Sequence, residues 1–188
     1  MLQLESVHKQ FATKVLLEGA TAHLRPRARG GLVGPNGAGK TTLFRMILGE
    51  ESPDKGTIRK RPRLRVGYLP QELETIVGKT VLDATHRDLY PEHEAERILA
   101  GLGFSEADFS RPIENLSGGY RMRVALAHLL LSNPDVLMLD EPTNHLDKPT
   151  QRWFERFLRD SNLTLLVISH DTKFLDGIAT HIWELRDR

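Results

Sequence analysis

A run of four apolar residues, VLML at 136–139, followed directly by two carboxylates is the feature that most constrains this chain. An unbroken apolar strand is typical of a parallel sheet that helices cover on both faces. Asp140 and Glu141 then lie at the carboxyl end of that strand, where ligands bind in open α/β sheets. Adjacent carboxylates beside an apolar strand are costly unless their charge is compensated. This pattern favours a magnesium ion together with a nucleotide.

The overall composition sets limits on the class of protein. The chain has 188 residues, which suits one α/β domain with a small subdomain. Its net charge of +1 argues against a surface dedicated to nucleic acid, although a local patch stays possible. The absence of cysteine excludes disulfides and thiolate zinc sites. No run reaches the ~18 apolar residues of a membrane span, and the N-terminus lacks a signal-peptide pattern, so we expect a soluble cytoplasmic protein.

Strand and helix patterns alternate along the chain, which predicts a mainly parallel sheet. Strands are expected at 2–7 with a hairpin through 11–17, at 32–33, once or twice within 57–69, at 136–139, at 163–168 and at 182–185. Helices are expected at 42–48, within 81–103, from 117 to about 133 and from 149 onward.

The segment GPNGAGKT at 34–41 matches the pattern G-x-x-x-x-G-K-[ST] and lies between a short apolar strand and a helix pattern. Its glycines let backbone N–H groups turn toward phosphate oxygens, and the helix N-terminus adds a partial positive charge. Lys40 is expected to reach the β- and γ-phosphates, and the Thr41 hydroxyl to bind magnesium. The alternative is a glycine-rich turn without a ligand. The predicted nucleotide-binding residues are Gly34, Pro35, Asn36, Gly37, Ala38, Gly39, Lys40, Thr41 and Thr42.

The phosphate loop gives the two carboxylates distinct roles. Asp140 is expected to hold magnesium, directly or through water. Glu141 is the candidate general base that polarises the attacking water. The alternative for Glu141 is a solvated carboxylate at a strand end.

Four further motifs follow in an order that resembles the nucleotide-binding domain of the ATP-binding cassette (ABC) superfamily. They are YLPQ at 68–71, LSGGY at 116–120, NHLD at 144–147 and SHD at 169–171. The resemblance covers nearly the whole chain. It implies a P-loop NTPase of class α/β, with an ABC-type mainly parallel core, an N-terminal antiparallel β part and a small helical subdomain. Within the single domain 1–188, we expect 1–71 and 125–188 to form the ATP-binding core and 72–124 the helical signature subdomain.

The signature segment Ser117, Gly118 and Gly119 begins a helix pattern, where free N–H groups make an anion site. Its alternative is a plain N-cap. The resemblance implies that this segment contacts the γ-phosphate bound by a different cassette, so that two cassettes enclose two ATP molecules head to tail.

The resemblance also implies roles for four single residues. His170 would contact the γ-phosphate, Gln71 would touch magnesium, Phe11 would stack on adenine and Asp147 would cross the dimer seam. Taken without the family, Gln71 is more often a loop amide and Phe11 more often a core residue. The implied catalytic group is Glu141, His170 and Lys40, and the implied metal group is Thr41, Gln71 and Asp140.

The run EPTNHLD at 141–147, together with RMRVALA at 121–127 and FLD at 174–176, is similar to the ABC-F group. ABC-F proteins carry two cassettes in one chain and act on ribosomes as translation or antibiotic-resistance factors. This chain has one of each motif, so it resembles a first cassette without the linker. Only 46 positions separate Gln71 from Ser117, too few for the inserted arm of that group, and its loss is expected near residues 86–91.

Two departures from the family and one basic cluster complete the pattern. The run Arg29, Gly30 and Gly31 has a glycine where the family usually has an apolar strand residue, which predicts weaker strand packing. Thr172 stands where ABC-F chains often have arginine.

A basic cluster lies between residues 55 and 65. It favours a charged, solvated strand edge, and the alternative is contact with ribosomal RNA phosphates. Its members are Lys55, Arg59, Lys60, Arg61, Arg63 and Arg65.

The leading hypothesis is an ATPase cassette that works as an ATP-driven conformational switch, with ATP and Mg²⁺ as cofactors. Its partners would be a second cassette, from a homodimer or a missing second half of the chain, and the ribosome. One alternative is the ATPase subunit of a membrane transporter. The other is a fragment that binds nucleotide but is inactive without a second cassette.

Overall fold

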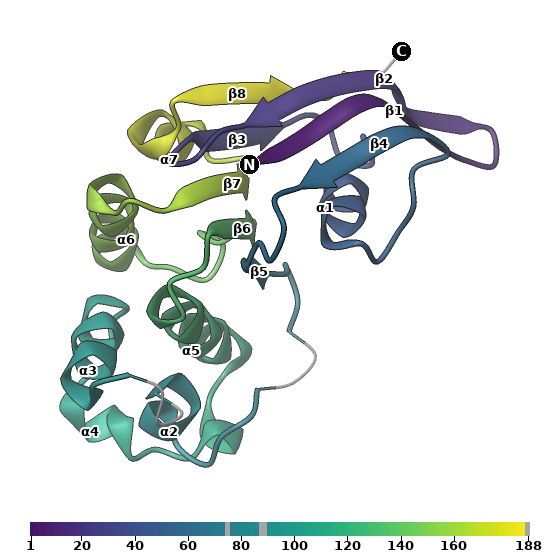
Figure 1. Cartoon of the computed structure of the whole chain (residues 1–188). Coiled ribbons are helices and arrows are strands. Elements are labelled where there is room, and N and C mark those ends of the chain that lie inside the picture. The colour runs from purple at the N-terminus through teal and green to yellow at the C-terminus, as the bar shows by residue number, and fades with distance from the viewer. Residues whose placement is uncertain (74–75, 87–89, 187–188) are drawn as a thin grey trace.

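The computed structural model describes residues 1–73, 76–86 and 90–186. Two sheets form the upper part of the molecule in Figure 1. The smaller sheet is antiparallel in the order β2-β1-β4, and the larger is parallel in the order β5-β6-β7-β3-β8. The antiparallel strands are β1 (Leu2–Phe11), β2 (Lys14–Leu24) and β4 (Lys55–Lys60). The parallel strands are β3 (Arg29–Val33), β5 (Val66–Leu69), β6 (Val136–Asp140), β7 (Thr164–Ile168) and β8 (His181–Glu184).

The interior strand β6 faces a hydrophobic core on each side. Val136 and Met138 pack with β1, β2 and the helix that follows β3, whereas Leu137 and Leu139 pack with the helices of the opposite face. All four side chains are at most 1% exposed. Burial on both faces explains why the sequence is apolar without alternation.

Helices cover both faces of the parallel sheet (Figure 1). Helix α1 (Lys40–Leu48) lies under the antiparallel sheet, and its Leu43 and Phe44 belong to the core shared with β1 and β2. Helices α6 (Lys148–Asp160) and α7 (Thr172–Ile178) cover the other face. This arrangement places the carboxyl ends of β6 and β7 beside the N-terminus of α1.

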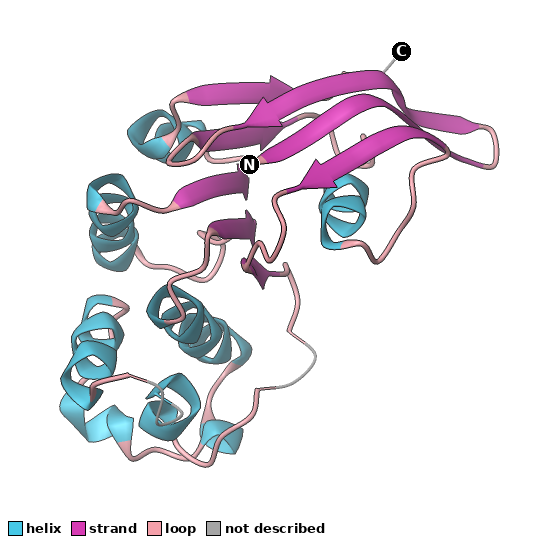
Figure 2. Cartoon of the chain, viewed as in Figure 1, coloured by secondary structure: helices cyan, strands magenta, loops and turns pink. Residues whose placement is uncertain are grey.

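The helical subdomain is made of helices and loops (Figure 2). Its elements are α2 (Val81–His86), α3 (Glu92–Gly101), α4 (Glu106–Phe109), the 3₁₀ turn η1 (Ile113–Asn115) and α5 (Gly118–Leu131). Helix α5 continues through residues 124 and 125. The division of the chain into 1–71 with 125–188 and 72–124 stays a prediction. The junction expected near 86–91 includes residues 87–89, which lie outside the described residues.

The fold class predicted from the sequence is confirmed, with differences in detail. The pattern at 57–69 supplies two strands in different sheets, because β4 pairs with β1 and β5 pairs with β6. The short helix α7 was not predicted. Within the described ranges, no helix is both long and apolar enough to cross a membrane.

The two glycines of β3 do not leave the packing defect that the sequence suggested. A Cβ added to Gly31 would lie 2.7 Å from Ile182 Cδ1 and 3.3 Å from Leu175 Cδ2. A Cβ on Gly30 would lie 3.1 Å from Leu166 Cδ1. Larger neighbouring side chains fill the space that the glycines leave, so the expectation of weak packing is wrong.

Candidate nucleotide site

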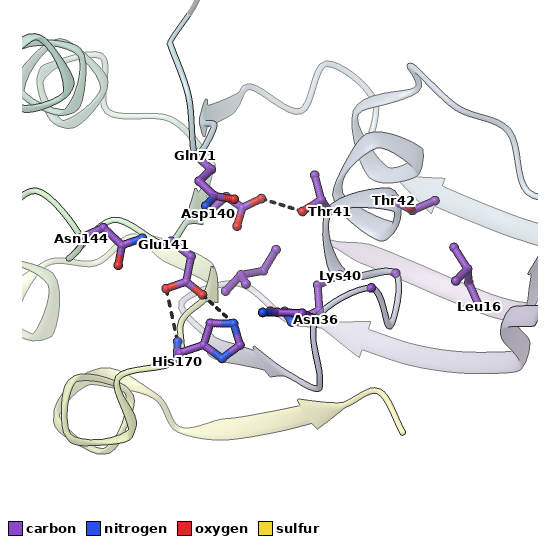
Figure 3. A pocket seen from close by; sticks show the side chains of 13 residues that line it. Leu16, Asn36, Lys40, Thr41, Thr42, Gln71, Asp140, Glu141, Asn144 and His170 are labelled. Atoms are coloured by element: carbon purple, nitrogen blue, oxygen red, sulfur yellow. Dashed lines mark hydrogen bonds and ion pairs between the residues drawn. The ribbon is translucent and has the colours of Figure 1, made fainter. Parts of the chain in front are cut away.

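A cavity of about 400 Å³ opens where β6 and β7 end and the β3–α1 loop begins (Figure 3). Ten residues predicted from the sequence line it: Asn36, Gly37, Gly39, Lys40, Thr41, Thr42, Gln71, Asp140, Glu141 and His170. Leu16, Asn144 and Ile168 line it as well and were not predicted. Gly34, Pro35, Ala38 and Phe11 are not among the lining residues.

The loop between β3 and α1 is curled by its glycines and by Lys40. Gly39 is the N-cap of α1 and has a φ of 98°, in the left-handed region that glycine adopts without strain. Gly34 allows close backbone approach, because a Cβ there would lie 2.5 Å from the carbonyl oxygen of Leu185. Lys40 Nζ donates to the carbonyl oxygens of Gly34 and Pro35 at 2.7 and 2.9 Å. A buried cation therefore faces the loop backbone at the helix N-terminus, an arrangement suited to phosphate.

Oxygen donors suited to magnesium meet in the same cavity. The Thr41 hydroxyl donates to Asp140 Oδ2 at 2.9 Å, and Gln71 lies beside them (Figure 3). Burial raises the pKa of Asp140, while the Thr41 hydrogen bond and the Lys40 charge oppose that rise. Hydroxyl, amide and carboxylate oxygens are the ligands Mg²⁺ prefers, and it takes few of them from protein when phosphates supply others. The donor set therefore fits the predicted ion.

Among the described residues, Glu141 is the one buried carboxylate with a buried oxygen that makes no hydrogen bond. Its Oε2 accepts the backbone N–H of His170 at 3.3 Å. Its Oε1 lies 3.4 Å from His170 Nε2 but makes no hydrogen bond to any described residue. The side chain of Glu141 is 8% exposed. Its burial raises the pKa of the carboxyl, which makes the ionised form a stronger base.

Backbone contacts fix Glu141 in this position. Its φ of 51° is in the left-handed region, which is uncommon for a residue with a side chain. The Glu141 N–H donates to the carbonyl oxygen of Ile168 on β7 at 2.9 Å. This strained turn aims the carboxylate into the cavity, a position where strain is typically functional.

The loop that carries His170 is anchored by its neighbours. Asp171 caps α7 by accepting the Phe174 N–H at 3.1 Å, and Gln151 Nε2 donates to Asp171 Oδ2 at 3.0 Å. Gln151 is 6% exposed on α6 and was missed from the sequence. The sequence signal that could have identified Gln151 is a polar residue on the core-facing side of the helix predicted from residue 149.

The signature segment lies outside the cavity. Ser117 is the N-cap of α5, and its Oγ accepts the Tyr120 N–H at 3.5 Å. Gly118 is exposed, and a Cβ added there would meet no atom within 4 Å. A Cβ on Gly119 would lie 3.6 Å from His145 Cβ. The segment is thus open to solvent beside the loop that follows Glu141.

Asp147 is joined to the helical subdomain of its own chain. Its Oδ1 accepts from Thr150 Oγ1 at 2.7 Å and from Arg123 Nη2 at 3.1 Å. Arg123 also donates from Nε to the His145 carbonyl at 3.0 Å and from Nη1 to the Leu102 carbonyl at 3.2 Å. The sequence did not predict Arg123 as a link. Its guanidinium connects α5, the end of α3 and the loop after Glu141.

Phe11 and the basic cluster complete the predicted residues. Phe11 is 48% exposed, with Lys9 Nζ 5.0 Å from its ring centre.

Most members of the basic cluster make ion pairs or hydrogen bonds with other strands or helices of the chain. Arg59 pairs with Glu5 at 3.3 Å, while Arg61 and Arg65 pair with Asp135 at 3.1 and 3.6 Å. These pairings support the charged strand edge over an RNA surface.

A protein-family model described as "ABC transporter" matches residues 17–144. The chain belongs to this family. Among curated relatives, "ABC transporter F family member 5" of Arabidopsis thaliana is 33% identical over 97% of this chain and 33% of the relative. "Energy-dependent translational throttle protein EttA" of Escherichia coli (strain K12) is 37% identical over 90% of this chain and 38% of the relative. The resemblance of this ABC cassette to the ABC-F group is thereby confirmed.

The chain spans about a third of the length of these curated relatives. The alignment with the Arabidopsis protein is 231 positions long, although this chain has only 188 residues, of which 97% are aligned. Within the aligned region, the relative therefore has residues without a counterpart here. Among solved structures, a dimeric ATP-binding cassette in a post-hydrolysis state bound to ADP and Pi superposes with a TM-score of 0.83. It is 22% identical, and 98% of this chain and 94% of that one are covered, which shows the shared fold.

Proposed function

We propose that this cassette binds ATP in the described cavity and hydrolyses it, with Glu141 as the general base. ABC cassettes are ATPases, and the observation that carries the assignment here is Glu141 Oε1, which is buried, lies 3.4 Å from His170 Nε2 and makes no hydrogen bond to any described residue. A buried carboxylate oxygen without a hydrogen bond is costly unless it serves a ligand. Glu141 lines the cavity together with Lys40, Thr41 and Asp140.

Each residue of the cavity has a defined task in this proposal. Lys40 neutralises the β- and γ-phosphates, and the loop N–H groups orient them. Glu141 accepts a proton from the attacking water, and His170 orients that water and the γ-phosphate. Thr41, Asp140 and Gln71 would hold Mg²⁺, which supplies charge stabilisation to the phosphates when bound.

A second cassette completes the site in this proposal. Ser117 and Gly118 are exposed and lie outside the cavity of their own chain, which is what a contact to another chain's γ-phosphate requires. A second copy of this chain can supply that contact, because a two-fold pair offers each copy's signature to the other's phosphate loop. Asp147 would lie at the seam of that pair.

The wider role proposed is a translation-related switch on the ribosome, as a first ABC-F cassette without arm and linker. It is supported by similarity to relatives that include a translational throttle protein. Under this proposal the chain works in the cytoplasm. A transporter subunit and an inactive fragment are the competing functions, and no contact among the described residues favours either.

The test is the Glu141→Gln variant, which keeps the shape of the side chain and removes the base. We expect ATP affinity within twofold of the unchanged chain and steady-state turnover at least 100-fold lower. Asp160→Asn, an exposed carboxylate on α6, is the matched control and should leave both values unchanged. Equal turnover in Glu141→Gln and the control contradicts the assignment of the base.

A further inference from the structure

Helix α6 carries an arginine ridge, defined here as Arg152, Arg156 and Arg159. Spacings of four and three residues place the three on one face of the helix. All three are exposed. None of the three guanidinium groups makes an ion pair with any residue in the described part of the chain. The ridge rises about 10 Å along the helix axis at 1.5 Å per residue.

The acidic residue in the middle of the ridge, Glu155, lines one hollow with all three arginines but makes no ion pair with them in the described part of the chain. Glu155 Oε1 accepts from Gln151 Nε2 at 3.2 Å, and its carboxylate lies 3.6 Å from where a Cβ on Gly177 of α7 would be. That carboxylate is therefore turned toward α7. Like charges at these spacings destabilise a helix. The basic cluster at 55–65 differs, because three of its arginines pair with carboxylates.

An aromatic pair flanks the ridge. The rings of Trp153 and Phe157 stack with centroids 5.3 Å apart and an interplanar angle of 28°. A Cβ on Gly101 of α3 would fall 1.9 Å from Trp153 Cε2, so the indole lies directly against the backbone of that helix. Both aromatic side chains are partly exposed. They line a cavity of about 560 Å³ between α3 and α6, together with Arg97, Arg156, Asp160 and Ser161. Arg97 is paired with Glu94 at 2.8 Å.

We propose that the arginine ridge and the Trp153–Phe157 pair form a binding surface for single-stranded RNA. Guanidinium groups bind phosphates in a planar, bidentate geometry, so a ridge of this length suits two or three consecutive phosphates. Aromatic rings beside a basic track are the platform on which unpaired bases stack. The proposal rests on the proposed function, in that it names RNA as the ribosomal component that this face contacts.

The combination of features favours RNA over an anionic membrane. A lipid surface takes up aromatic side chains that are free to insert between headgroups, whereas Trp153 and Phe157 are packed against the core and line a cavity. Rings and guanidinium groups at one cavity suit a planar base, and the neighbouring ridge suits its backbone.

The experiment measures binding of the full chain to a fluorescent single-stranded oligoribonucleotide at several salt concentrations. The ridge variant carries Arg152→Gln, Arg156→Gln and Arg159→Gln. The control carries Lys55→Gln, Arg59→Gln and Arg63→Gln, three exposed residues of the basic cluster with the same loss of charge. We expect the ridge variant to bind at least tenfold more weakly. The slope of log affinity against log salt should fall by about 2, since three phosphate contacts are lost.

The control should keep both its affinity and its salt slope within experimental error. Equal weakening of the two variants, or no weakening of the ridge variant, overturns the proposal, as does an unchanged chain that binds no RNA. Stronger binding to anionic phospholipid vesicles than to RNA also overturns it. ATP turnover is measured on the same samples, so that loss of RNA binding with intact turnover separates this surface from the nucleotide site.

Base stacking is tested separately by fluorescence. In a Trp183→Phe background, Trp153 is the sole tryptophan, because the chain contains two. RNA should quench its emission, and the ridge variant should need at least tenfold more RNA for the same quenching. RNA binding without any change in Trp153 emission contradicts the stacking part of the proposal.

Discussion

The phosphate end of the parallel sheet and the signature at the start of α5 are built in opposite ways. Lys40, Asp140 and Glu141 are buried, and each contacts a residue of another segment within the chain. Ser117 and Gly118 are exposed, and open space surrounds the Gly118 position. The first region is preorganised by its own fold, whereas the second presents backbone N–H groups outward. This difference matches the proposed function, in which the chain positions phosphates itself and offers its signature to a second cassette.

Arg123 joins these two regions. It lies on α5, six residues after the N-cap Ser117, and its side chain is 11% exposed. Three of its nitrogens bind the Leu102 carbonyl, the His145 carbonyl and the Asp147 carboxylate. Arg123 therefore links the signature helix directly to the loop that follows Glu141.

The largest effect should come from breaking the two regions one at a time. Lys40→Ala removes the buried cation and should weaken ATP binding at least tenfold. Ser117→Arg fills the open signature and should leave ATP affinity within twofold. Both variants should lose at least 100-fold in turnover. A fluorescent ATP analogue gives the affinities, and phosphate release gives the rates. Weak ATP binding by Ser117→Arg would place the signature in its own chain's site and remove the contrast.

A smaller effect is expected where the two regions are joined. Arg123→Ala leaves two backbone carbonyls and the Asp147 carboxylate without their donor, at a cost of about 2 kcal/mol in the free energy of unfolding. Thermal unfolding should shift down by roughly 4–8 °C for a domain of this size. Arg45→Ala, on the exposed side of α1, is the control and should shift by less than about 2 °C. Equal shifts in the two variants would show that Arg123 is an ordinary surface residue.

The smallest effect concerns stability and pH. Burial raises the pKa of Glu141 above its unfolded value, so its ionisation destabilises the folded state as pH rises through that raised pKa. Glu141→Gln removes this penalty. At pH 7 the variant should therefore unfold a few degrees higher than the unchanged chain, and the difference should shrink toward pH 4. Unfolding curves at the two pH values provide the measurement. A lower unfolding temperature for the variant at pH 7 contradicts the burial cost.

Much of this architecture could be predicted because local sequence carries it. The apolar run at 136–139 and the glycines at 34–39 act within a few residues, and both lie where expected. The pairing of β4 with β1 and of β5 with β6 depends on contacts distant in sequence, so the pattern at 57–69 could not assign the strands to sheets. Gln151 and Arg123 act through partners 20 or more positions away, which a single sequence does not reveal.

The most direct test of the central claim, that two copies complete one site, mixes two inactive variants. Lys40→Ala retains a signature, and Ser117→Arg retains a phosphate loop. Half of randomly paired dimers contain one of each, with one complete site of two, so the mixture should recover about a quarter of the unchanged ATP turnover. A mixture that stays as inactive as either variant alone, while both remain folded and Ser117→Arg binds ATP, contradicts the claim.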